Sequence, residues 1–229
     1  MTTSRKPSED KRKIARIVIV DDHPIVREHL KSLIEQQRDL EVCASVPDAA
    51  EAMKAVAAER PDMAIVDLSL QETHGLDLIK NLARHHPELP VLVLSMHDER
   101  LFADRVLAVG ARGYITKQEA TSRIMIAIRK VLAGDIYVSD QMAERILHRA
   151  VDGEAKKPVS SLSQLTDREL QVFQLTGHGL TTREIAKQLR VDVKTVETYR
   201  MRIKDKLHLG SATALLQYAV QWTQNSGGG

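Results

Sequence analysis

The sequence predicts an α/β protein in which a (βα)5 doubly wound parallel-sheet domain precedes a small all-α domain of four helices. Short aliphatic runs alternate with stretches of helical period over residues 16–133, and no strand pattern follows residue 165. A chain of 229 residues with 43% apolar content can bury one large core or two modest ones. We therefore expect two domains.

Five aliphatic runs are the predicted strands of the first domain, and an amphipathic segment follows each of them. Several runs are continuous rather than alternating, which is typical of a parallel sheet covered by helices on both faces. The predicted strands are 17–20, 40–46, 63–66, 91–94 and 113–115, and the predicted helices are 25–37, 48–58, 76–85, 99–109 and 119–133.

The middle of the chain changes character between the two predicted domains. The stretch "VDGEAKKPVSSLSQ" is polar and carries Gly, Pro and Ser, which is typical of a linker, and one short amphipathic helix from about Ser139 precedes it. The expected segments are a disordered basic leader at 1–15, the first domain at 16–133, a linker at 134–163, the second domain at 164–223 and a disordered tail at 224–229.

Charge and cysteine content narrow the function classes. Lys and Arg number 17 against 21 Asp and Glu over residues 14–150, but 9 against 6 over residues 163–222, so the second part is the one suited to nucleic acid. Cys43 is the only cysteine, which excludes an internal disulfide and a CxxC metal site. No apolar run approaches the roughly 20 residues of a membrane span, and the start lacks the apolar region of a secretory signal. We expect a cytoplasmic protein with no membrane partner.

Five chemistry-bearing side chains stand where predicted strands end. The segment "IVIVDDHP" places Asp21 and Asp22 directly after the first strand, although two carboxylates about 4 Å apart repel by roughly 4 kcal/mol. Asp67 follows the third strand, Ser95 the fourth and Lys117 the fifth. Because ligands of open parallel sheets lie beyond the carboxyl ends of the strands, we expect these residues to converge on one site that contains a cation.

Phosphoryl transfer to a carboxylate uses such a set, with Asp67 as the acceptor. Lys117 would neutralise a phosphoryl oxygen, and Ser95 would donate a hydrogen bond to the phosphoryl group. Mg²⁺ prefers oxygen ligands. The predicted ligands are Asp21, Asp22, Asp67 and the main-chain carbonyl of Ser69.

Each of these residues also has a simpler interpretation. An Asp at a strand end is a common helix N-cap, and Asp22 before Pro24 suits that role. For His23, an exposed position in a turn is favoured over a role as a proton donor or ligand. Tyr114 taken alone is more often a packed aromatic of an edge strand than a switch.

Four short helical segments follow residue 165. Thr166, with Glu169 three residues later, forms a predicted capping box at the start of the first. Thr181 or Thr182 caps the next helix, and a tight connection leads from it to a longer basic helix. Two short helices, a small turn and a basic helix predict a helix-turn-helix motif at 181–200.

The basic helix has an apolar side and a polar side on a helical wheel. The predicted core side consists of Val193, Val196, Ile203 and Leu207. A helix in the major groove reads bases with its N-terminal part, while cations around it meet phosphates. The predicted base contacts are Glu197, Thr198 and Met201, and the predicted phosphate contacts are Thr182, Lys194, Arg200, Arg202 and Lys204. The alternative for this helix is a solvated charged face.

Both parts of the chain resemble known families. Residues 16–133 resemble a response-regulator receiver domain through "VIVDDHPIVREHL", "AIVDLSLQETHGLDLI", "VLVLSMHDE" and "GARGYITKQEA". The C-terminal part resembles a LuxR-type helix-turn-helix domain through "LTDRE", "EIAKQL" and "KTVETYRMRIKDKL". Together they make the chain similar to a NarL/FixJ-type two-component response regulator.

The resemblance implies a phosphorylation-controlled, DNA-binding transcriptional regulator. A sensor histidine kinase would transfer phosphate to Asp67 with Mg²⁺, after which the loop carrying Ser95 shifts and Tyr114 rotates. Homodimerisation and binding to double-stranded promoter DNA would follow, through a recognition helix at 192–207 and a dimerisation helix at 211–222. RNA polymerase is a further candidate partner.

Two positions depart from the receiver pattern. Gln71 stands four residues after Asp67, where the family usually has a proline, and no proline follows Lys117, where many receivers have one. The first departure bears on the kinetics of phosphorylation, and the second bears on the turn after the fifth strand.

Two functions of other classes share part of this pattern. A phosphatase or phosphotransferase of the haloacid-dehalogenase type also uses an aspartate nucleophile and Mg²⁺, but it normally needs a second aspartate two residues later, where this chain has Ser69. A LuxR-type receptor for a small apolar signal would be expected to line its pocket with aromatics, yet the chain has only seven Phe, Trp and Tyr residues. We expect a regulator that assists its own phosphorylation and dephosphorylation and is not otherwise an enzyme.

Overall fold

The computed structural model describes residues 14–70, 75–151 and 161–226. The expectations for the leader before residue 14, for Gln71, for residues 152–160 of the linker and for the last three residues lie outside this part of the chain. The described residues form two compact units. One runs to Leu94 and includes Val106–Tyr137, and the other combines Ser95–Arg105 with the residues from Val138 onward.

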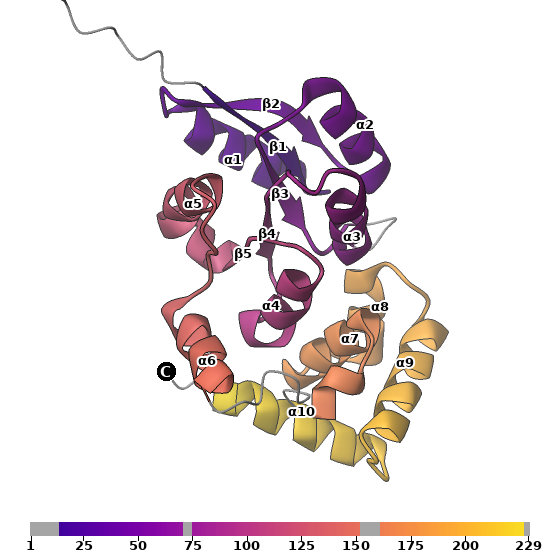
Figure 1. Cartoon of the computed structure of the whole chain (residues 1–229). Helices are drawn as coiled ribbons and strands as arrows, with labels where there is room; N and C mark the ends of the chain where they lie inside the picture. The colour runs from indigo at the N-terminus through magenta and orange to yellow at the C-terminus, as the bar shows by residue number, and fades with distance from the viewer. Residues whose placement is uncertain (1–13, 71–74, 152–160, 227–229) are drawn as a thin grey trace, which may run out of the picture. The chain divides into compact units, whose positions relative to one another are not determined.

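A five-stranded parallel sheet forms the centre of the first unit (Figure 1). Its strand order is β2-β1-β3-β4-β5, so the chain winds in one direction from β1 to β2 and in the other from β3 onward. The predicted doubly wound fold is thereby confirmed. The strands are β1 (Ala15–Val20), β2 (Leu40–Val46), β3 (Met63–Asp67), β4 (Val91–Ser95) and β5 (Gly113–Thr116).

Helices cover both faces of this sheet, which is why β1, β3 and β4 contain runs of consecutive buried apolar residues. Ile17 and Ile19 of β1 join a core with residues of α1 (Pro24–Glu35) and α5 (Lys117–Leu132) on one face. The intervening Val18 is also completely buried, on the opposite face of the sheet. The helices of that opposite face include α2 (Ala49–Glu59) and α3 (Gly75–His85) (Figure 1), and α4 (Glu99–Ala108) follows β4.

The carboxyl ends of the strands carry the candidate site residues, so their exact positions decide where these side chains lie. β3 extends to Asp67 and β4 to Ser95, one residue beyond the predicted ends. β5 ends at Thr116, whose hydroxyl accepts a hydrogen bond from the main-chain N–H of Glu119 and caps α5. Lys117 is therefore the first residue of α5, fixed directly behind the last strand.

The C-terminal part is helical, as predicted. The elements are α6 (Asp140–Val151), a 3₁₀ turn (Ser161–Gln164), α7 (Asp167–Gly177), α8 (Thr182–Leu189), α9 (Val193–Lys206) and α10 (Ala212–Ser226). Capping boxes begin α7 at Thr166 and α8 at Thr181, each closed by a glutamate three residues later.

The longest described helix is α5, with 16 residues, and no described helix is both long and apolar enough to cross a membrane.

The core of these helices confirms most of the predicted apolar side of α9. Val196 and Ile203 are completely buried, and Leu207 is half-buried. Val193 was wrongly assigned to the core, because it is 40% exposed. It is the first residue of α9, and a helical wheel gives the direction of a side chain but not how far the neighbouring helices extend beside it.

Candidate functional site

Asp21 and Asp67 lie side by side because their strands are neighbours. β1 pairs with β3 in parallel, with Val20 opposite Val66, so the next residue of each strand reaches the same edge of the sheet. Both carboxylates are buried, each about 1% exposed. Two buried carboxylates on neighbouring strands need a cation close by, since a buried charge without a partner is costly inside a protein.

Lys117 supplies one such cation. Its Nζ lies 2.7 Å from Oδ2 of Asp67 and 2.7 Å from Oδ2 of Asp21. The capped start of α5 holds the lysine at this edge, and its side chain is only 11% exposed. The expected convergence of residues from the first, third and fifth strands is therefore observed for these three side chains.

Burial and the neighbouring charges shift the pKa values of Asp67 and Lys117. Burial raises the pKa of Asp67, and the attraction of Lys117 lowers it only in part, so the net shift is upward. Burial lowers the pKa of Lys117, but the carboxylates of Asp67 and Asp21 outweigh this effect and raise it. Lys117 is thus held as an ammonium, while Asp67 holds a proton more tightly than an ordinary carboxyl. A further cation beside Asp67 would lower the pKa of its carboxyl.

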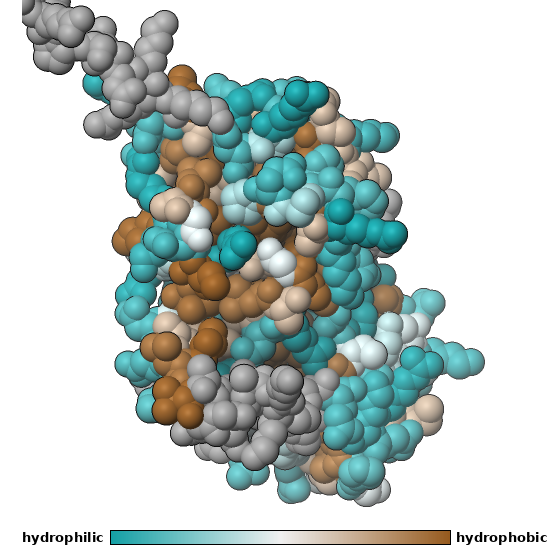
Figure 2. All heavy atoms as spheres, viewed as in Figure 1, coloured by the Kyte–Doolittle hydropathy of each residue, from teal (hydrophilic) through white to brown (hydrophobic). Residues whose placement is uncertain are grey.

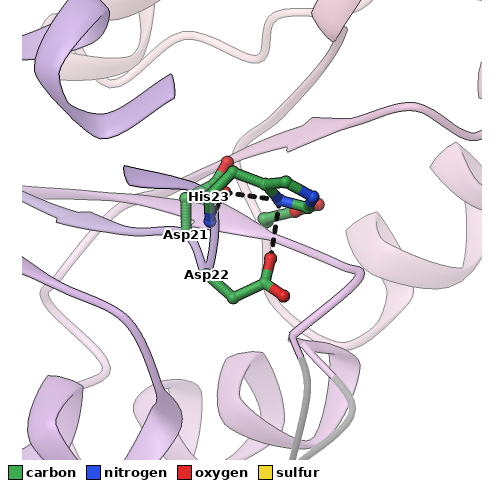
Figure 3. Close-up of side chains that lie close together, drawn as sticks. Asp21, Asp22 and His23 are labelled. Carbon is green, nitrogen blue, oxygen red and sulfur yellow. Dashed lines mark hydrogen bonds and ion pairs between the residues drawn. The ribbon is translucent and has the colours of Figure 1, made fainter. Parts of the chain in front are cut away.

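Asp22 and His23 complete the acidic corner (Figure 3). Nδ1 of His23 lies 2.7 Å from Oδ1 of Asp22 and 3.2 Å from Oδ1 of Asp21, and the main-chain N–H of His23 donates to the latter atom at 2.8 Å. The N-cap of α1 is His23, and the side chain of His23 makes no capping hydrogen bond. The simpler interpretation of Asp22 as an N-cap is therefore wrong.

The donor set suits a hard divalent cation. Asp21, Asp22, His23 and Asp67 each offer one ligand atom, and these atoms lie within 4.8 Å of one another. Three of the four groups are carboxylates, the ligand type that Mg²⁺ prefers. Ser69, whose carbonyl is the remaining predicted ligand, stands two residues after Asp67 and donates its main-chain N–H to Oδ1 of Asp67 at 3.0 Å.

Ser95 and Tyr114 occupy the two strands on the other side of β3. Leu94 pairs with Asp67, so Ser95 is the next residue along β4, and its buried hydroxyl accepts a hydrogen bond from the main-chain N–H of His97 at 3.1 Å. Tyr114 is completely buried in β5. This burial agrees with the interpretation of Tyr114 as a packed aromatic of a strand.

Two residues of the site were not predicted from the sequence. Gly75, the first residue of α3, packs against the backbone after β3: a Cβ there would lie 2.2 Å from the carbonyl oxygen of Asp67 and 2.6 Å from Cα of Leu68. Arg27 donates a hydrogen bond from Nη1 to the carbonyl oxygen of Asp21 at 2.5 Å. The sequence indicates these two contacts only by the presence of Gly75 and Arg27 near the acidic motifs.

The polar side of α9 is a second candidate site. Lys194, Glu197, Met201 and Arg202 are exposed, and the surface over α9 is mostly hydrophilic in Figure 2. Arg200 has a structural contact as well, because its Nη1 donates to the hydroxyl of Thr182 at 2.9 Å and links α9 to α8. The other predicted contacts on this helix, Thr198 and Lys204, are half-buried.

Family models match both parts of the chain. Residues 17–129 match the response regulator receiver domain, and residues 163–219 match the LuxR family of bacterial regulatory proteins. Oxygen regulatory protein NreC of Staphylococcus epidermidis is 35% identical over 211 residues, which cover 90% of this chain and 97% of that protein. The chain is a NarL/FixJ-type response regulator. Its receiver and LuxR-type domains make it a phosphorylation-controlled, DNA-binding regulator of transcription.

This response regulator is also similar to proteins of known structure. RcsB from Salmonella enterica serovar Typhimurium, bound to promoter rprA in the presence of the phosphomimetic BeF₃⁻, is 26% identical with a TM-score of 0.58, over 90% of this chain and 98% of that chain. A two-component response regulator of the LuxR family from Aurantimonas sp. SI85-9A1 is 34% identical with a TM-score of 0.56, over 61% of this chain and 99% of that chain.

Proposed function

We propose that Asp67 of this response regulator accepts a phosphoryl group from a sensor histidine kinase. The observation that carries this proposal is the pair of 2.7 Å contacts from Lys117 Nζ to Asp67 and Asp21 at the carboxyl edge of the sheet. A buried carboxylate beside a fixed ammonium can receive a phosphoryl group whose new charge is neutralised at once. The proposed ligands of Mg²⁺ are Asp21, Asp22, Asp67 and the main-chain carbonyl of Ser69.

The transfer step requires little from the protein beyond position and charge. One oxygen of Asp67 forms a bond to phosphorus as the bond from phosphorus to the donor nitrogen breaks, and the donor imidazole leaves with the electron pair. When bound, Mg²⁺ supplies positive charge to the phosphoryl oxygens. The N–H of Ser69, which donates to Oδ1 of Asp67, fixes the orientation of the carboxylate before transfer.

Phosphorylation then acts on a two-state equilibrium of the receiver. The phosphoryl group recruits the Ser95 hydroxyl as a hydrogen-bond donor, and the movement of this loop is coupled to the buried Tyr114 ring. If phosphorylation converts a nearly fully inactive population to a nearly fully active one, it favours the active form by roughly 5.5 kcal/mol. A smaller free-energy difference would leave the regulator partly active without phosphorylation or partly inactive with it.

The active form binds promoter DNA as a homodimer through α9. A helix in the major groove reads bases near its N-terminus, so Glu197, Thr198 and Met201 are the proposed base contacts. Two half-sites about one helical turn apart, roughly 34 to 36 Å, fit such a dimer. The proposed phosphate contacts are Thr182, Lys194, Arg200, Arg202 and Lys204. RNA polymerase is a further candidate partner of this regulator, and the cytoplasm is its proposed location.

The test of the regulatory function begins with duplexes selected from a random pool by the phosphoryl-donor-treated protein. Fluorescence anisotropy then measures the affinity of the selected duplex before and after treatment with phosphoramidate and Mg²⁺. We expect tighter binding after treatment for the wild-type chain and no change for Asp67→Asn. Equal affinities before and after treatment would contradict the proposal. Steady release of phosphate from a small substrate would instead favour a phosphatase of the haloacid-dehalogenase type.

A further inference from the structure

The segment Ser95–Arg105 begins at the last residue of β4, yet it packs with the C-terminal helices in the second unit. Two contacts tie the segment to α7. At its far end, Nη1 of Arg105 lies 2.8 Å from Oδ1 of Asp167. At its near end, Nδ1 of His97 lies 2.9 Å from Oε1 of Gln174. The mechanism above assigns a role to Ser95 but none to these two contacts.

The contact between His97 and Gln174 is buried and well oriented. The two residues are 6% and 5% exposed. An amide oxygen can only accept, so Nδ1 of His97 carries the proton and donates it. The imidazole ring also stacks on the ring of Phe102, with centroids 4.8 Å apart and 27° between the planes, which fixes the direction of Nδ1. A buried amide oxygen that loses its donor is costly, so this bond opens only if another interaction offsets the loss.

The main chain of His97 is tied to the hydroxyl of Ser95. Its N–H donates to Oγ of Ser95 at 3.1 Å, so one residue contacts the switch hydroxyl with its backbone and α7 with its ring. When Oγ moves to donate to a phosphoryl group on Asp67, the backbone of His97 is drawn along with it. A hydrogen bond of 2.9 Å is lost beyond about 3.5 Å, so a displacement of about 1 Å is sufficient to break it.

We propose that His97 transmits the position of Ser95 to α7, through a hydrogen bond to Gln174 that exists in the unphosphorylated chain and breaks when Asp67 is phosphorylated. This inference rests on the proposed function and deepens it, because it names the pair of side chains through which the signal leaves the sheet. His97 is a positioning residue in this role, since it acts through Ser95 and Gln174. The pair of Arg105 and Asp167 lies ten residues beyond Ser95 and keeps the segment on α7 in both forms.

Such a bond reduces the fraction of the unphosphorylated chain that is competent to bind DNA. One hydrogen bond changes an equilibrium by roughly fivefold. Removing it should therefore raise the DNA affinity of the unphosphorylated chain by roughly fivefold, because apparent affinity follows the competent fraction. The phosphorylated chain has already lost the bond, so its affinity should not change. The gain in affinity on phosphorylation should shrink by the same factor.

The variants that test this inference are His97→Phe and Gln174→Leu in the full-length chain. His97→Phe keeps a ring that can stack on Phe102, and Gln174→Leu keeps a side chain of similar size. Fluorescence anisotropy with the selected duplex measures affinity before and after treatment with phosphoramidate and Mg²⁺. We expect each variant to bind roughly fivefold more tightly than the wild type before treatment, and within about twofold of it afterwards. The double variant should match the single ones, since all three lack the same bond.

Gln171→Leu is the matched control. Gln171 is a completely buried glutamine one turn earlier in α7, and its Oε1 accepts from Nη1 of Arg168 at 3.0 Å instead of from His97. The control removes the same amide from the same helix, so it should keep the wild-type ratio of affinities before and after treatment. General destabilisation of α7 would weaken binding in both conditions, which separates it from loss of the bond to His97.

The inference is overturned if both variants bind as the wild type does before treatment, if their affinities change by the same factor before and after treatment, or if the two effects add in the double variant. Each of these results leaves the proposed function intact as long as the wild-type chain responds to phosphoramidate. A wild-type chain whose affinity does not respond would overturn the proposed function, and the role of His97 with it.

Discussion

Nζ of Lys117 lies 2.7 Å from Oδ2 of Asp67, and both side chains are withdrawn from solvent. Fifty residues of sequence separate them, so this contact reports that β3 and the start of α5 have reached the same edge of the sheet. The lysine also contacts Asp21, which makes it the charge that holds two buried acids together. Its removal should have consequences for both stability and metal dependence.

We expect Lys117→Met to destabilise the first unit by about 3 kcal/mol at neutral pH, because removing one partner of a buried pair leaves the other charge uncompensated. Addition of Mg²⁺ should restore part of this loss, since the ion offsets the same carboxylates. Amide hydrogen exchange of β1 and β3 with EDTA or with Mg²⁺ measures both effects. Lys80→Met, which removes an exposed pair with Asp77, is the control and should cost less than about 1 kcal/mol. Equal protection in the two variants would contradict this account.

Gly75→Ala should damage the acceptor site without touching a charged group. The added Cβ would overlap the carbonyl oxygen of Asp67 and Cα of Leu68, and backbone atoms cannot move away as the end of a side chain can. We expect a loss of stability of about 2 kcal/mol and a slower reaction of Asp67 with phosphoramidate, followed by intact-protein mass spectrometry. Gly210→Ala, where a Cβ meets nothing within 4 Å, should behave like the wild type. A Gly75→Ala chain that reacts at the wild-type rate would refute the role of this close contact.

The C-terminal helices should lose stability in acid through Glu169. Burial raises the pKa of Glu169, but hydrogen bonds from Lys206 and from Thr166 outweigh burial and lower it below the ordinary value of 4.5. A carboxylate with a depressed folded-state pKa contributes stability above its unfolded pKa, and this contribution disappears as the pH falls through the folded pKa. We therefore expect the free energy of unfolding to fall below about pH 4.5 in the wild type, and to fall less in Glu169→Gln.

Trp222 is the reporter for this measurement. It is the only tryptophan of the chain, and its ring lies 6.3 Å from the ring of Phe173 in α7. Its fluorescence during urea titrations at several pH values follows the unfolding of these helices. Glu184→Gln is the control, because Glu184 closes the other capping box but is exposed, so its removal should change the acid sensitivity less. The same pH dependence in wild type and Glu169→Gln would contradict the assignment.

Substitutions on α9 should separate sequence reading from phosphate contact. We expect Met201→Ala and Thr198→Ala to alter the preferred DNA sequence, whereas Arg202→Ala should weaken all duplexes alike and reduce the salt dependence of binding. Met201 is 52% exposed, which is unusual for a large apolar side chain and consistent with a contact surface. Affinities for matched and scrambled duplexes at several salt concentrations distinguish base contacts from phosphate contacts. Equal losses on every sequence for all three variants would refute it.

The sequence predicted the sheet because buried parallel strands leave a direct signature of uninterrupted aliphatic residues. The same signature located Asp21, Asp67 and Ser95, since a polar residue that ends such a run must lie at the edge of the sheet. Lys117 followed from the same reasoning, although its double contact with Asp21 and Asp67 depends on where α5 begins. These four positions could be predicted from local sequence patterns and from the rule that ligands of a parallel sheet lie beyond the carboxyl ends of its strands.

The remaining features depend on contacts between distant segments, which local patterns do not carry. Gly75 is required because α3 starts against the backbone of β3, and the spacing of its motif does not reveal this approach. His23 was expected to be an exposed turn residue, and its side chain is indeed 55% exposed, but the turn aims its nitrogen at Asp22. Val193 was assigned to the core by direction alone, while the extent of the surrounding helices decides its exposure.

The most direct test of phosphorylation at Asp67 is the intact mass of the chain after exposure to acetyl phosphate or phosphoramidate, with and without Mg²⁺. We predict the mass of one added phosphoryl group on the wild-type chain in the presence of Mg²⁺, and no addition on Asp67→Asn under the same conditions. Addition of the same mass to Asp67→Asn would contradict the account, because the acceptor would then lie elsewhere in the chain.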